Sequence, residues 1–136
     1  MTRILIDTCV LSELLRKKNA DPVIRDEVRR LIDNDQAVII GCIIQEILSG
    51  IRNQEQFDKI EYALGLFEDF PLQREDYCLA ARYSNTCARH GVQGSSIDFL
   101  ICAFSVRNNF PIFTTDKDFI HYSKQIPIEL YSFPEK

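Results

Sequence analysis

The chain has 136 residues, of which 46% are hydrophobic and 26% charged, and it contains 5 glycines and 5 prolines. This is the size and composition of one folded domain, so a second domain, a collagen-like repeat and a disordered chain are all excluded. The formal net charge of −4 excludes nucleic-acid binding by overall positive charge alone, and leaves only local or metal-assisted binding.

Short apolar strands alternate with amphipathic helices along the chain. Residues 3–6 predict a strand, and Leu11, Leu14 and Leu15 follow it at helical spacing. Asp21-Pro22 is typical of a helix start and opens a helix over 22–32. The later segments predict a strand at 37–41, helices at 43–48 and 54–67, a brief strand at 70–72, helices at 75–90 and 97–106, a strand at 111–115 and a helical turn at 118–122.

This alternation indicates an α/β fold of three layers, with a mostly parallel sheet, in a single domain over 1–136. The 5 cysteines are odd in number and form no C-x-x-C pair, so neither a disulfide framework nor a zinc site is favoured. The apolar run at the start is too short for a signal peptide, and no stretch approaches the ~18 apolar residues of a membrane span. We therefore expect a cytoplasmic protein that does not engage a membrane.

Two aspartates directly follow predicted strands. Asp7 comes after residues 3–6 and Asp116 after residues 111–115. In an open parallel sheet, ligands bind beyond the carboxyl ends of the strands, so both carboxylates lie at one rim if those strands are neighbours. Taken singly, each aspartate is better explained as a helix N-cap.

Two further acidic residues interrupt apolar helices. Glu46 lies among isoleucines and a leucine, and Asp98 lies among Ile97, Phe99 and Leu100. A carboxylate there is partly desolvated unless a cation or hydrogen-bond donors compensate it. Each also has a structural explanation, because Glu46 can lie at the edge of the buried stripe and Asp98 lies in the first helical turn, where negative charge is favoured.

Together the four carboxylates predict an oxygen-only site for a hard divalent cation such as Mg²⁺. Mutual repulsion would oppose their clustering unless an ion or protons intervened. Such a site activates a water as nucleophile and stabilises charge on a phosphoryl group. It requires no histidine, which suits a chain with only 2.

With these residues the sequence resembles the PIN domain family, and within it the VapC-type ribonuclease toxins of bacterial toxin–antitoxin pairs. The segments that carry the resemblance are 4–8, 11–15, 45–51, 96–103 and 114–119. It implies a small, mostly parallel sheet flanked by helices and RNA cleavage that depends on Mg²⁺ or Mn²⁺. It also implies a homodimer and a cognate antitoxin protein that holds the toxin inactive.

The resemblance also implies roles for particular residues. Those assigned to metal binding and catalysis are Asp7, Glu46, Asp98 and Asp116, with Asp118 as an accessory residue and the Thr114 hydroxyl as an orienting contact. Cys9 departs from the pattern, because relatives often carry asparagine there. Candidate phosphate contacts are Arg16, Lys17 and Lys18, which a solvated helix face explains as well.

Other functions fit less well. A receiver-type phosphoacceptor domain expects an acidic pair after the first strand and an aspartate after a central one, but Asp7 stands alone and the 37–41 strand is followed by Cys42. A phosphatase of the haloacid dehalogenase type expects an aspartate where Cys9 stands. The remaining alternative is a catalytically inactive PIN-like binding scaffold, against which the presence of all four acidic residues speaks.

Overall fold

The computed structural model describes residues 2–133. The strands are β1 (Ile4–Ile6), β2 (Ala37–Ile40), β3 (Glu68–Phe70) and β4 (Ile112–Phe113). The helices are α1 (Thr8–Leu15), α2 (Pro22–Asp33), α3 (Gly41–Leu48), α4 (Gln54–Leu64), α5 (Arg74–Arg89), α6 (Ser96–Asn108) and α7 (Asp118–Ser123). Within residues 2–133, no helix has both the length and the apolar character needed to cross a bilayer.

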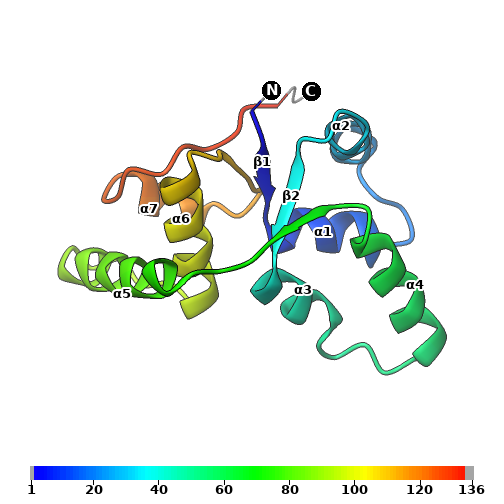
Figure 1. Ribbon diagram of the computed structural model, residues 1–136, viewed down its shortest axis with the longest axis horizontal. Coiled ribbons are helices and arrows are strands. Elements are labelled where there is room, and N and C mark those ends of the chain that lie inside the picture. The colour runs from blue at the N-terminus through cyan, green and yellow to red at the C-terminus, as the bar shows by residue number, and fades with distance from the viewer. Residues whose placement is uncertain (1, 134–136) are drawn as a thin grey trace.

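The four strands form one parallel sheet in the order β3-β2-β1-β4. Every residue of β1 and β2 is buried, as expected for apolar strands covered on both faces. Figure 1 shows α1, α2, α3 and α4 on one side of β1 and β2, and α5, α6 and α7 on the other. The predicted three-layer α/β class is therefore confirmed.

The pairing of β1 with β4 determines where the two strand-end aspartates lie. The strands are parallel, with Leu5 opposite Ile112 and Ile6 opposite Phe113. The backbone N–H of Asp7 donates to the carbonyl of Phe113 at 3.0 Å. Because neighbouring parallel strands end at the same edge, the segments that follow β1 and β4 begin side by side.

The boundary between α4 and β3 differs from the prediction. The helix expected over 54–67 ends at Leu64, and the strand expected at 70–72 lies earlier, at β3. Pro71 has no N–H to donate to a ladder, so β3 ends before it. The strand opens instead with two exposed acidic residues at the sheet edge, and this left no apolar pattern to mark it.

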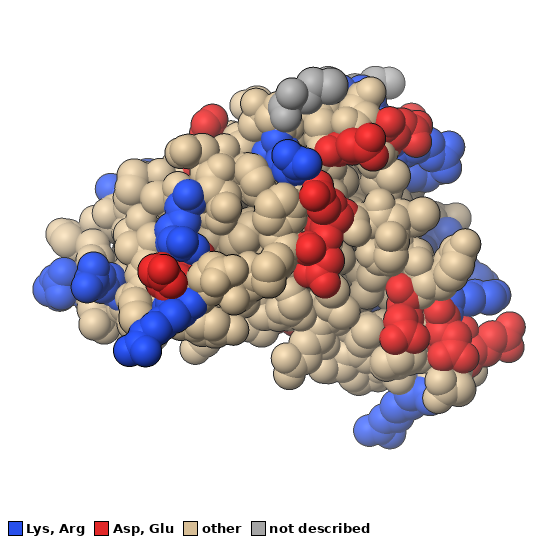
Figure 2. Space-filling model, in the orientation of Figure 1, with Lys and Arg blue, Asp and Glu red and all other residues tan. Residues whose placement is uncertain are grey.

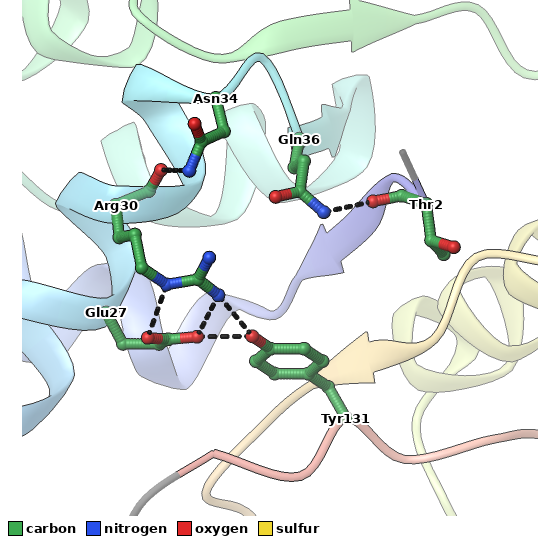
Figure 3. Close-up of polar contacts among 6 residues, drawn as sticks. All are labelled: Thr2, Glu27, Arg30, Asn34, Gln36 and Tyr131. Carbon is green, nitrogen blue, oxygen red and sulfur yellow. Dashed lines mark hydrogen bonds and ion pairs between the residues drawn. The ribbon is translucent and has the colours of Figure 1, made fainter.

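The segment after α7 returns to the sheet and is attached to α2. Tyr131 donates its backbone N–H to the carbonyl of Ile112 at 2.8 Å. Its hydroxyl donates to the buried carboxylate of Glu27 and accepts from the Arg30 guanidinium at 2.9 Å (Figure 3). Arg30 also pairs with Glu27 at 2.8 Å. These contacts join the end of the described chain to the opposite layer.

Candidate metal centre

Three carboxylates from two separate parts of the fold converge at one point. Asp98 lies in the first turn of α6, Asp116 follows β4, and Asp118 is the first residue of α7. One oxygen from each lies within 4.8 Å of those of the other two. The Asp116 Oδ1 atom accepts the backbone N–H of Asp118 at 2.9 Å, which fixes the loop between them.

Asp7 is held beside this group by three donors. It is 4% exposed and is the N-cap of α1, because its Oδ1 atom accepts the N–H of Thr8 at 2.7 Å. Its Oδ2 atom accepts the Thr114 hydroxyl at 2.7 Å and the Cys9 thiol at 3.2 Å. The same Thr114 hydroxyl accepts the backbone N–H of Asp116 at 3.0 Å. Asp7 therefore caps α1, as expected, and also lies beside the other carboxylates.

Within residues 2–133, no basic side chain forms an ion pair with these carboxylates. Burial is the main cause that raises the pKa of Asp7 and of Asp98 above the usual value, and the charge of Asp98 raises the pKa of Asp7 further. The charges of Asp116 and Glu46 act on Asp98 in the same direction. The ion pairs found among residues 2–133 all involve other acidic side chains. The arrangement therefore favours a cation or protons.

Glu46 lies at the margin of the site. Its charge reaches Asp98, but its carboxylate is outside the group of three oxygens. On α3 the inward positions are Ile43 and Ile47, and Glu46 is exposed. Of the two explanations left open for Glu46, the structure supports a place at the edge of the buried stripe and not desolvation, whereas Asp98 is half-buried as expected.

The basic residues after α1 are exposed and lie away from this group. Arg16, Lys17 and Lys18 follow a helix of eight residues, which spans ~12 Å from its start beside Asp7. Lys17 pairs with Glu13 at 2.7 Å. Figure 2 shows basic and acidic side chains interspersed over the face it presents, so that face offers no continuous basic surface.

Two side chains at the site escaped sequence reasoning. The Tyr122 hydroxyl donates to Asp98 Oδ2 at 2.7 Å across 24 positions of sequence. Cys9 bonds Asp7 and also accepts the backbone N–H and the hydroxyl of Thr115, both at 3.3 Å. Neither role produces a local pattern in the sequence. Cys9 was noted only because relatives often carry asparagine at that position.

Two grooves border the carboxylates. The larger has a volume of about 780 Å³, is lined by residues of α3, α5 and α6 with the segment after β3, and includes Glu46. The smaller, of about 520 Å³, includes Thr114, Asp116 and Lys117. Glu46 therefore borders the larger groove and Asp116 borders the smaller one.

The family model of the PIN domain matches residues 4–125. The chain belongs to the PIN domain family. This confirms the family that the acidic motifs indicated. No curated protein matches this PIN domain in sequence.

Solved structures share the fold of this PIN domain at low sequence identity. FitAcB from Neisseria gonorrhoeae is 18% identical, with a TM-score of 0.76 over 95% of this chain and 96% of that chain. VapBC2 from Rickettsia felis, bound to a DNA fragment from its promoter, is 14% identical, with a TM-score of 0.80 over 98% of this chain and 100% of that one. VapBC-5 from Mycobacterium tuberculosis is 16% identical, with a TM-score of 0.69 over 96% and 98%.

The raised pKa values predict a pH-dependent effect of the Asp7→Asn substitution. Burial raises the pKa of Asp7 in the folded protein, so between the unfolded and folded pKa the folded state binds more protons. In the metal-free protein, the stabilisation that protonated Asp7 gives the folded state is therefore lost as the pH rises from about 4, the usual pKa of an unfolded aspartate, through the pKa of folded Asp7. We expect Asp7→Asn to become increasingly more stable than the wild type over this range. Urea unfolding in chelator at several pH values measures this, and a pH-independent difference would contradict it.

Proposed function

We propose that this PIN domain is a metal-dependent endoribonuclease, the toxin of a type II toxin–antitoxin system, which hydrolyses RNA phosphodiester bonds with a metal-activated water. The observation that carries the proposal is the convergence of Asp98, Asp116 and Asp118 beside Asp7, with no basic partner among the described residues. A purely structural role explains the site less well, because the charges of the buried Asp7 and the half-buried Asp98 are costly without a cation.

The donor set fits Mg²⁺ or Mn²⁺. Every side chain of the group offers carboxylate oxygen, which these hard cations prefer, and partial exposure leaves room for the waters that Mg²⁺ retains. We assign metal binding to Asp98, Asp116 and Asp118, joined by Asp7 and by Glu46 at the margin. When bound, the ion polarises a phosphoryl oxygen and lowers the pKa of an attacking water.

The remaining residues support and orient the reaction. Thr114 and Cys9 hold the Asp7 carboxylate, and Thr114 also holds the backbone of Asp116. The larger groove has a volume in the range of small-ligand sites, and Glu46 at the margin of the metal site is one of its lining residues. We therefore place a nucleotide that flanks the scissile phosphate in this groove. We assign outer phosphate contacts to residues 16–18.

The solved structures that share this fold support an antitoxin partner. One from Klebsiella pneumoniae is described as a toxin–antitoxin complex, and VapBC-5 from Mycobacterium tuberculosis is described as a member of the VapBC family of toxin–antitoxin systems. We therefore propose a cognate antitoxin protein as the inhibitor of this chain, a homodimer as its own assembly, and the cytoplasm, where its RNA substrate is found, as its location.

A metal-dependence assay tests the proposed activity. We expect the purified chain to cleave single-stranded RNA in Mg²⁺ or Mn²⁺, to lose cleavage to background in chelator, and to regain it when excess Mn²⁺ is added. RNA fragments resolved on a denaturing gel measure each step. Binding of Mn²⁺ without cleavage would instead identify a catalytically inactive scaffold.

The RNA target is found by a separate experiment. Brief induction in a host that lacks the antitoxin, followed by sequencing of the new RNA ends, identifies the cleaved RNA and the bases around the cut. A consistent sequence or structure at those ends is expected for an endoribonuclease, and ends spread evenly over all RNAs would contradict selective cleavage.

A further inference from the structure

We propose that Tyr122 is a positioning residue that orients the Asp98 carboxylate for the metal ion. The inference rests on the proposed metal-dependent function and adds a residue to the machinery of that site. It concerns the phenol hydroxyl and not only the ring.

The hydroxyl makes a direct and well-supported contact. Tyr122 on α7 is fully buried and donates to Asp98 Oδ2 at 2.7 Å. Its ring packs on Phe99 with a centroid distance of 5.1 Å and meets Phe119 edge-on at 5.1 Å. Because both neighbours are themselves buried, the ring has one position and its hydroxyl one direction.

This contact acts on a carboxylate whose other side-chain hydrogen-bond partner is Ser95. Asp98 is half-buried, and the ion pairs among the described residues do not include it. The phenol hydrogen bond restricts rotation of the carboxylate while leaving it charged, since a phenol is a neutral donor. Partners of this kind commonly determine how well a ligand residue binds its ion.

The loop before α6 is shaped around the same hydroxyl. A Cβ atom on Gly94 would overlap the Tyr122 hydroxyl oxygen and would lie 2.7 Å from Cζ. Position 94 therefore requires glycine because a side chain would have no room. The phenol fills a gap between α7 and the start of α6 that only a residue without a side chain leaves open, and this brings it to Asp98.

A role limited to packing makes a different prediction. If Tyr122 served only the core, phenylalanine would keep its contacts with Phe99 and Phe119 and leave the metal site unchanged. If it positions Asp98, removal of the hydroxyl weakens metal binding even though the ring stays in place.

The test compares Tyr122→Phe with a matched control, Tyr131→Phe. Tyr131 also donates its hydroxyl to a buried carboxylate, that of Glu27, but Glu27 lies outside the acidic group (Figure 3). Calorimetric titration of RNA-free protein with Mn²⁺ measures affinity, and circular dichroism verifies folding. We expect Tyr122→Phe to bind Mn²⁺ about 10-fold more weakly than the wild type and Tyr131→Phe to match the wild type. Equal affinities in all three proteins would overturn the proposal.

The Gly94→Ala variant approaches the same contact from the other side. Its Cβ must displace the Tyr122 hydroxyl, so we expect weaker Mn²⁺ binding here too, and unchanged affinity in a folded variant would count against the proposal. If the wild type binds no Mn²⁺, this inference and the proposed function both fail. If Tyr122→Phe binds Mn²⁺ more weakly than the wild type and Tyr131→Phe does not, but none of these proteins cleaves RNA, the inference holds and the proposed activity fails.

Discussion

Replacing Asp98 by asparagine is expected to lower the rate of RNA cleavage at least ~100-fold while the protein stays folded. Asparagine keeps the shape of the side chain and an oxygen that can accept the Tyr122 hydroxyl. It removes one negative charge from the three oxygens that lie within 4.8 Å of one another. Metal ions stabilise the transition states of such reactions by several kcal/mol, so the loss of one charged metal ligand has a large effect on the rate. Initial rates of RNA cleavage in saturating Mn²⁺ measure it.

Asp33→Asn is the matched control. Asp33 is an exposed aspartate at the end of α2 and lies outside the carboxylate group, so its variant is expected to cleave RNA at the wild-type rate. Both variants carry the same change of charge, which separates the site from an effect of net charge on RNA binding. Wild-type cleavage by Asp98→Asn would contradict the assignment of this group to catalysis.

Replacing Phe113 by alanine is expected to destabilise the protein by about 3–5 kcal/mol. Phe113 is fully buried at the end of β4, and its ring packs on Tyr131 at 5.4 Å and on Phe133 at 4.6 Å between centroids. A loss of this size is a large part of the ~5–15 kcal/mol that stabilises an ordinary domain. The midpoint of urea unfolding measures the change.

A conservative change and an exposed aromatic residue provide the comparison. Phe113→Leu keeps much of the buried volume and is expected to cost less than about 1.5 kcal/mol. Tyr62 on α4 is 83% exposed, and Tyr62→Ala is expected to change stability by no more than ~0.5 kcal/mol. Similar losses in Phe113→Ala and Tyr62→Ala would show that β4 is not part of the core that positions Asp116.

The features that could be predicted from sequence are those with a local cause. Residues 3–6 form a short apolar run, and Asp7 follows it directly, so both β1 and the cap of α1 were visible. The apolar run predicted as a helix over 97–106 lies within α6, which has Ser95 as its N-cap. The pairing of β1 with β4 was only a condition of the predicted shared rim, and the structure meets that condition.

The features that escaped prediction depend on long-range packing. Glu46 lies among isoleucines in sequence, but the direction of α3 decides which side of the helix is covered, and Glu46 is on the open side. β3 has no apolar pattern because it is an edge strand. The contact from Tyr122 to Asp98 joins two helices that only the completed fold brings together.

The order in which the carboxylates occur along the chain limits when the acidic cluster can assemble during synthesis. Asp7 leaves the ribosome early, but β4, its neighbour in the sheet, and the three clustered aspartates all belong to the segment from residue 98 onward. A nascent polypeptide, or one shortened by a premature stop codon before Asp98, therefore lacks the cluster. The proposed metal site is therefore complete only when the C-terminal third of the chain has emerged and docked.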